Sequence, residues 1–353
     1  KYYPLFEKEA KHREQEYKDL DGYVKSLEKS VNTGTATEQQ IIDYHSMVMK
    51  RTKLRKKLIV YKTVDAVDVY DKLCDMHIKS SMPYIVYRDT VNYKNNMKNI
   101  GTVEGLNLCL EITEPSTPDS IASCNLAHVN LKRFVLEEYS NGKNLKDCYD
   151  FKQLGESCRS LVRNLNKVVD FNRYPLDKYD KEGNVIERGK ISIPNLTNRP
   201  LGIGVSGLAE VFANLRISYD APQAYEINKM IFACMYYNCL YESVIIAKEN
   251  EQKSGWKDLG FYKTFESDSF EAYSNGRWKQ YVGSPLSNGF FQFDMWKQEA
   301  DYLRSIDGLD EKIYNPEDDV PVQPSEWGQG GSWDNLRTMI LRYGVYNSMF
   351  LAP

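Results

Sequence analysis

The chain has 353 residues and a formal net charge of −3, which excludes the strongly basic surface of a protein that binds nucleic acid or anionic membranes. Apolar residues make up 42% and charged residues 27%, enough for a sizeable core in one large α/β domain or two smaller ones. Neither an apolar run of about 18 residues nor a signal-like start is found. The seven cysteines are scattered without CxxC pairs, which indicates free thiols and a cytoplasmic location.

The first part of the chain is dominated by charge. Residues 1–57 favour peripheral surface helices, with a polar loop around residues 31–37. Two short β-prone runs follow, at residues 58–61 and 83–87, and a helical stretch over residues 64–80 separates them.

Two later helices are indicated by apolar periodicity. Apolar residues recur at helical spacing over residues 151–170, and Asp220 with Pro222 predicts the N-cap and first turn of the next helix. Cys158 and Cys234 fall on the apolar stripes of these helices, so we expect both to be core residues.

The glycine-rich run at residues 201–207 lies between these helices. It has GxGxxG spacing without the acidic residue of a dinucleotide site, so it predicts a buried strand entering a helix through tight backbone packing. Residues 177–195 are polar, carry a turn signal and predict a surface hairpin. Strands alternating with helices indicate an α/β fold with parallel strands, in an open or a closed sheet.

The segment at residues 106–112 alternates without exception between apolar and functional side chains. In an extended chain Asn107, Cys109 and Glu111 would share one face at intervals of roughly 6.6–6.8 Å, while the leucines and the isoleucine take the other. An amide, a thiol and a carboxylate in a row suit chemistry on a sugar-sized ligand. A half-buried strand with a polar outer face is the alternative. Cys124 follows, and a return strand would bring the two sulfurs together.

These residues resemble the large, catalytic subunits of ribonucleotide reductases over roughly residues 65–353. Residues 82–107 are similar to the stretch that leads into that family's active-site loop, Asn107-Leu-Cys-Leu-Glu111 to its N-x-C-x-E motif, and Cys124-Asn-Leu-Ala127 to its redox-cysteine motif. Further family-like runs follow in the family's order: 163–170, 199–209, 284–289, 292–296 and 343–348.

The resemblance implies a fold and a domain organisation. The fold is a ten-stranded α/β barrel of two parallel five-stranded halves, with a finger loop that carries the catalytic cysteine through its centre. Residues 1–64 would be a charged, helical peripheral segment and residues 65–100 the end of the first half. Residues 101–353 would hold the finger loop and most of the second half.

The resemblance also implies roles for individual residues. Cys109 would be the thiyl radical that abstracts the ribose 3′-hydrogen, Glu111 would take the 3′-hydroxyl proton, and Asn107 would orient the ribose. Leu108 would lie with these three against the substrate. Cys124 would be one of two thiols that reduce the substrate and end as a disulfide.

Partners follow from the same resemblance, which is to class I enzymes acting on ribonucleoside diphosphates. A metal-containing small subunit would supply the radical, a second large subunit would complete a dimer, and thioredoxin or glutaredoxin would restore the thiols. We expect this chain to bind no metal or cofactor directly, ATP and dNTP effectors to bind outside it, and neither nucleic acid nor membrane to be a partner.

Several parts of the family pattern are missing from this sequence or differ in it. No residue matches the second redox cysteine, the phosphate-binding loop is expected beyond Pro353, and the allosteric domain before Lys1. We therefore expect the isolated chain to be inactive. Residues 177–195 resemble an insertion, and His128 replaces a smaller residue. A cobalamin-dependent reductase, a glycyl-radical relative and a non-catalytic barrel homologue remain as alternatives.

Overall fold

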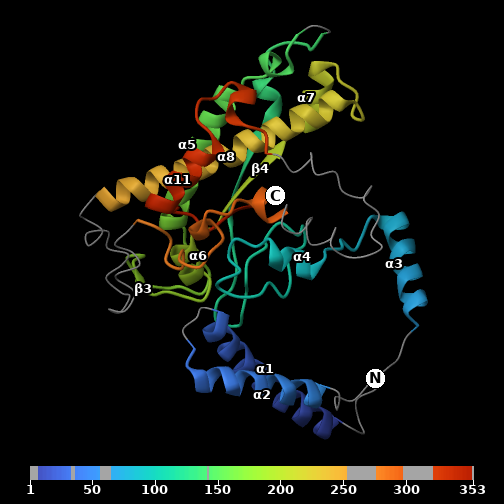
Figure 1. Cartoon of the computed structure of the whole chain (residues 1–353), viewed down its shortest axis with the longest axis vertical. Helices are drawn as coiled ribbons and strands as arrows, with labels where there is room; N and C mark the ends of the chain where they lie inside the picture. Colours follow the sequence, from blue (N-terminus) through green and yellow to red (C-terminus); the bar gives the residue numbers. More distant parts are fainter. Residues whose placement is uncertain are drawn as a thin grey trace. The chain divides into compact units, whose positions relative to one another are not determined.

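The computed structural model forms two compact units, Lys1–Pro83 and Tyr84–Pro353, each of which is considered by itself (Figure 1). The predicted domain boundaries at residues 64 and 100 stay predictions. The structure describes these residues: 7–32, 36–55, 65–140, 143–252, 276–296 and 321–351.

The first unit contains a helical hairpin of α1 (Glu7–Asn32) and α2 (Glu38–Arg55). Val24 on α1 is fully buried, and the Asp21 carboxylate accepts a hydrogen bond from Arg51 of α2 at 2.9 Å. Buried apolar residues of α1 and an ion pair between the helices therefore stabilise this charged hairpin among the residues that the structure describes.

The third helix, α3 (Ala66–Ser80), is capped by Asp65, whose side chain accepts from the backbone N–H of Val67 at 2.8 Å. The helix confirms the prediction over residues 64–80. The β-prone run at residues 58–61 lies outside the described residues. The run at residues 83–87 forms no strand, contrary to prediction, and leads with exposed side chains into α4 (Arg88–Tyr93).

The second unit is built on a parallel sheet. Strands β1 (Asn125–Asn130), β4 (Leu201–Ser206) and β5 (Phe350–Leu351) lie in the order β1-β4-β5, with Leu201 of β4 paired to Asn125 and to Phe350. The predicted α/β class with parallel strands is confirmed. Within the described residues this sheet is open at both edges.

Two long helices form the core with the sheet (Figure 1). Helix α5 (Phe151–Phe171) begins where Asp150 accepts from the N–H of Gln153 at 2.9 Å, and it packs along α8 (Pro222–Gln252). Both helices were predicted, including the proline that opens α8. Cys158 and Cys234 are fully buried, which confirms their core role.

Helix α11 (Trp333–Tyr343) also packs against α8. Among the described residues, α8 is the one helix that is long and apolar enough to cross a membrane. Most of that apolar stretch is buried inside the protein, so we assign it as a core helix.

The glycine-rich run forms β4 and enters α7 (Leu208–Leu215), which confirms the predicted strand and helix. Gly207 joins them with a φ of 80°, a conformation that glycine adopts without strain. A side chain at Gly202 would collide with Leu126 of β1, so the run serves close strand packing.

The predicted surface hairpin is correct only in part. Strands β2 (Lys178–Tyr179) and β3 (Val185–Glu187) pair antiparallel, but α6 (Ser192–Asn198) is a mostly buried helix. The reason is Asp177, whose buried carboxylate accepts from the N–H of Gly189 at 2.7 Å and holds the returning chain against the core. Short 3₁₀ turns complete the unit: η1 (Leu131–Phe134), η2 (Leu145–Cys148), η6 (Leu286–Asn288) and η9 (Pro324–Trp327).

Candidate active-site loop

Residues 92–113 form a loop that side-chain amides close on itself. Asn92 makes two hydrogen bonds with the backbone of Val103, accepting from its N–H at 2.7 Å and donating to its carbonyl oxygen at 3.0 Å. Asn95 donates to the carbonyl oxygen of Thr113 at 2.9 Å. These bonds take the place of a strand ladder, so the segment between them is free to turn.

A tight turn interrupts the alternating segment. The Asn107 carbonyl oxygen accepts from the N–H of Leu110 at 3.2 Å, and the Asn107 side-chain oxygen accepts from the N–H of Ile112 at 3.0 Å. Leu110 has a φ of 69°, which costs about 1–2 kcal/mol for a residue with a side chain. Cys109 is exposed at this turn. The hydrogen bonds of Asn107 must maintain the unfavourable backbone conformation of Leu110, and they thereby hold Cys109 at the turn.

The turn overturns part of the prediction. An extended chain over residues 106–112 would bury its leucines, whereas Leu108 is 76% exposed and Leu110 borders a cavity. The prediction of an extended backbone over these residues, which was based on the alternating side chains, is therefore wrong. Asn107 gives the reason, because an asparagine side chain that bonds to a nearby N–H competes with extended structure.

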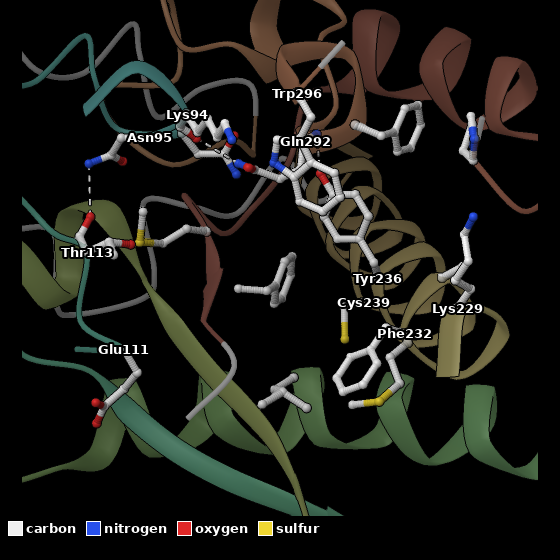
Figure 2. Close-up of a pocket in the computed structure, with 18 of the residues that line it drawn as sticks. Lys94, Asn95, Glu111, Thr113, Lys229, Phe232, Tyr236, Cys239, Gln292 and Trp296 are labelled. Carbon is white, nitrogen blue, oxygen red and sulfur yellow. Dashed lines mark hydrogen bonds between the residues drawn. The ribbon is translucent and has the colours of Figure 1, made fainter. Parts of the chain in front are cut away.

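Glu111 lies at the margin of a cavity of about 700 Å³. The cavity is bounded by residues 91–96, residues 110–113, one face of α8 and residues 292–296. Figure 2 shows Glu111 on one side of this space and the α8 side chains Phe232 and Cys239 on the other. One carboxylate oxygen of Glu111, Oε2, is buried and has no hydrogen-bond partner among the described residues, so it retains the capacity to bind a proton.

Cys124 directly precedes β1. Its side chain packs with Ile112 against Met97 and Met349, and its thiol donates a weak hydrogen bond to the carbonyl oxygen of Asn125 at 3.6 Å. Burial, followed by the nearby carboxylates of Glu114 and Glu111, raises the pKa of the Cys124 thiol far above its usual range. The thiol is therefore protonated at neutral pH.

Glu114 follows this loop directly, and the sequence prediction did not single it out. Its side chain is only 3% exposed, and burial raises the pKa of its carboxyl to about 8. The sole sequence signal was a second acidic residue three positions after Glu111, and in an extended chain these two would lie on opposite faces. Glu114 is buried because the chain turns before it and because Asn95 bonds to the neighbouring Thr113 carbonyl oxygen.

Three of the family-like runs meet in one buried polar network. Asn347 donates to Asn166 Oδ1 and to the Arg199 carbonyl oxygen, each at 2.9 Å. The guanidinium of Arg199, 1% exposed, donates to Asn166 and pairs with Asp170 at 2.8 Å. Ser243 of α8 donates to Asn347 at 3.0 Å. These runs therefore fix the amino ends of β4 and β5 against α5 and α8.

The structure thus places the predicted site residues in two neighbouring groups. Asn107, Leu108 and Cys109 belong to the exposed turn, while Glu111 and Cys124 lie at its base and interact electrostatically. Among the residues that the structure describes, no group of three or more His, Cys, Asp or Glu side chains is arranged to hold a metal ion.

Comparisons with known proteins identify the family of the chain. The family model described as "Ribonucleotide reductase, barrel domain" matches residues 10–353. Relatives named ribonucleoside-diphosphate reductase large subunit are 33% identical over 302 residues in Plasmodium falciparum and 33% over 294 in Caenorhabditis elegans, and 32% over 314 in Arabidopsis thaliana. The matches cover 86%, 83% and 86% of this chain but 29%, 28% and 30% of those relatives.

The chain therefore spans under a third of the length of these relatives. Because the family model covers nearly all of the chain, and the site motifs lie within that match, the chain belongs to the ribonucleotide reductase barrel-domain family.

Proposed function

We propose that the full-length protein is the large subunit of a class I ribonucleoside-diphosphate reductase, which converts ribonucleoside diphosphates to 2′-deoxyribonucleoside diphosphates for DNA synthesis. The relatives' names support the diphosphate substrate and the large-subunit role over the cobalamin-dependent and glycyl-radical alternatives. The proposal includes the ten-stranded barrel, completed by regions beyond the described sheet, with residues 92–113 as its finger loop.

The observation that carries this proposal is the turn that presents Cys109. Asn107 uses its side-chain oxygen to hold the turn, which leaves its Nδ2 group to donate to a ribose hydroxyl. Cys109 is exposed beside it, and Glu111 follows with a buried carboxylate oxygen that accepts no hydrogen bond from the described residues. A donor, a thiol and a base are thus carried by five consecutive residues of a constrained loop.

The chemistry assigns one role to each group. A thiyl radical at Cys109 takes the ribose 3′-hydrogen and becomes a thiol; once the substrate is reduced, this thiol returns a hydrogen atom to C3′ and the thiyl radical re-forms. Glu111 accepts the proton of the 3′-hydroxyl, which eases the loss of the 2′-hydroxyl as water. Two thiols then supply the two electrons and two protons of reduction and become a disulfide. Cys124 is one of them, and its protonated state keeps that proton in place.

The remaining partners are proposed on the family resemblance. A metal-containing small subunit generates the radical, a second large subunit forms the dimer, and thioredoxin or glutaredoxin reduces the disulfide. ATP and deoxynucleotide effectors would act through regions outside this chain, in the cytoplasm.

A direct assay tests the function. The full-length protein, mixed with its small subunit, a dithiol and a labelled ribonucleoside diphosphate, should release the 2′-deoxy product. The proposal would be contradicted if no product formed although the small subunit carried its radical and the large subunit bound the nucleotide.

Glu111→Gln separates the base from the binding site. We expect the variant to lose at least about 100-fold in turnover, the range for removal of a general base, while nucleotide affinity changes little because the amide keeps hydrogen-bonding capacity. Steady-state rates and equilibrium binding measure the two effects. Turnover within a few-fold of the unmodified protein would remove Glu111 from the mechanism.

The role of Cys124 predicts a disulfide. After turnover without an external reductant, mass-spectrometric mapping should find Cys124 linked to a cysteine outside this chain's 353 residues. Buried Cys158 should remain a free thiol in the same sample, as an internal control. Recovery of Cys124 only as a free thiol would argue against its redox role.

A further inference from the structure

The run at residues 292–296 is a family-like segment to which the proposed mechanism assigns no role. Its first residue, Gln292, lines the cavity that Glu111 borders (Figure 2). The side-chain amide of Gln292 donates to the carbonyl oxygen of Lys94 at 3.0 Å, and its backbone N–H donates to the hydroxyl oxygen of Tyr236 at 3.3 Å. Gln292 therefore connects the candidate active-site loop to helix α8.

A second set of contacts fixes this run to helix α11. Asp294 accepts from the backbone N–H of Phe291 and pairs with Arg337 of α11, in both cases at 2.8 Å. Arg337 also donates to the carbonyl oxygen of Gly289, and its guanidinium lies 4.7 Å from the centre of the Phe291 ring. Because the segment is bonded to two core helices, it offers the loop a fixed point of attachment.

The attachment at Lys94 is linked to Glu111 by two further hydrogen bonds. Lys94 is followed by Asn95, whose side-chain amide donates to the carbonyl oxygen of Thr113 at 2.9 Å (Figure 2). The N–H of Thr113 in turn donates to the carbonyl oxygen of Glu111 at 3.1 Å. These bonds join the chain that precedes the turn to the chain that carries Glu111, so Gln292 holds both.

The position of the Glu111 carboxylate depends on this backbone support. Its buried Oε2 atom has no hydrogen-bond partner among the described residues. The cavity of about 700 Å³ lies between Glu111 and the side chains of α8, so packing against α8 does not hold the carboxylate (Figure 2). A general base acts only within hydrogen-bond reach of the proton that it takes, and a loosely held loop would carry Glu111 out of that reach.

We propose that Gln292 is a positioning residue for the reaction, because its bond to Lys94 keeps the loop, and with it Glu111, in the place that proton transfer requires. The inference rests on the proposed function, which makes Glu111 the base. Loss of the bond should let the loop open more often. It should slow the chemical step more than it weakens nucleotide binding, since Gln292 itself touches no reacting atom.

Hydrogen exchange in the full-length protein tests whether Gln292 holds the loop. Gln292→Met keeps the length of the side chain and removes its donor, so the amides of residues 106–113 should exchange at least about fivefold faster. The matched control is Asn288→Met, which removes an amide that donates to the carbonyl oxygen of Ser284 at 3.2 Å within its own turn. Its exchange should equal that of the unmodified protein. Unchanged exchange over residues 106–113 in Gln292→Met overturns the proposal.

Turnover kinetics test whether the effect reaches Glu111. In Gln292→Met we expect kcat to fall about tenfold while KM stays within about twofold, because the base is displaced and the nucleotide still binds. In the Glu111→Gln background the same substitution should lower kcat by less than about twofold, since the base that it positions is already absent. A further tenfold loss in that background would reveal an independent structural effect and refute the positioning role.

Asn95→Ser interrupts the same connection at a second point. A serine hydroxyl can still accept from the N–H of Met97, as Asn95 does at 2.7 Å, but it is too short to reach Thr113. The same changes are expected, so this variant decides the question if Gln292→Met does not fold. Exchange needs neither radical nor substrate. If the unmodified protein forms no product, the proposed function fails, while exchange still decides whether Gln292 holds the loop.

Discussion

Replacing Cys109 with serine in the full-length protein is expected to abolish deoxyribonucleotide formation, with a loss of at least about 1,000-fold, or roughly 4 kcal/mol of barrier. A hydroxyl group does not form the radical that the thiol forms, because its O–H bond is much stronger than an S–H bond. Stability should change by no more than about 0.5 kcal/mol, since Cys109 is exposed at a turn. Turnover assays and chemical denaturation measure the two quantities.

The matched control is Cys74→Ser, which makes the same replacement at a partly exposed cysteine of α3. Its turnover should stay within about twofold of the unmodified protein, as for a surface substitution. Near-normal turnover of Cys109→Ser would eliminate the thiyl mechanism. A loss of activity with a matching loss of stability would assign Cys109 to the fold instead.

Arg199→Met is expected to lower the free energy of unfolding by about 2–4 kcal/mol, the largest effect on stability that we predict. Methionine fills similar space but donates nothing, so Asn166 loses two hydrogen bonds and Asp170 loses its ion pair. The contact of the guanidinium with the Tyr346 ring, 4.4 Å from the centroid, is lost as well.

Arg216→Met provides the comparison for this variant. Arg216 also follows a helix in the left-handed conformation and pairs with Glu138 at 2.8 Å, but its side chain is 72% exposed. We expect a cost below about 1 kcal/mol, because exposed pairs contribute little. Equal denaturation midpoints for the two variants would show that the buried network does not stabilise the fold.

Much of the second unit was predictable because its signals are local. The apolar period over residues 151–170 and the proline at residue 222 placed α5 and α8, and the glycines of residues 201–207 placed a buried strand and its helix. Residues 83–87 show the limit, since β-branched and aromatic residues predict a strand only where a partner strand is available.

The candidate site was predictable in residue type but not in shape. Alternation suggested an extended chain for residues 106–112, and the structure has a turn because amides of Asn92, Asn95 and Asn107 replace strand pairing. The burial of Glu114 follows from that turn. No local pattern specifies which backbone groups a side-chain amide will bind, so neither feature was visible in the sequence.

The buried network around Asn347 has a consequence for the order of folding. Asn347 bonds to Asn166 across 181 sequence positions, and within the part of the chain that the structure describes β5 pairs with β4 over two residues. Closing so long a loop has a large entropic cost, and the pairing of two residues of β5 stabilises the chain too little to offset it. The hydrogen bonds from Asn166 and Ser243 to Asn347 can form only after α5 and α8 have packed together. We therefore infer that β5 docks late and that contact order slows the final step. Until then, the edge of β4 is open to pairing with other chains.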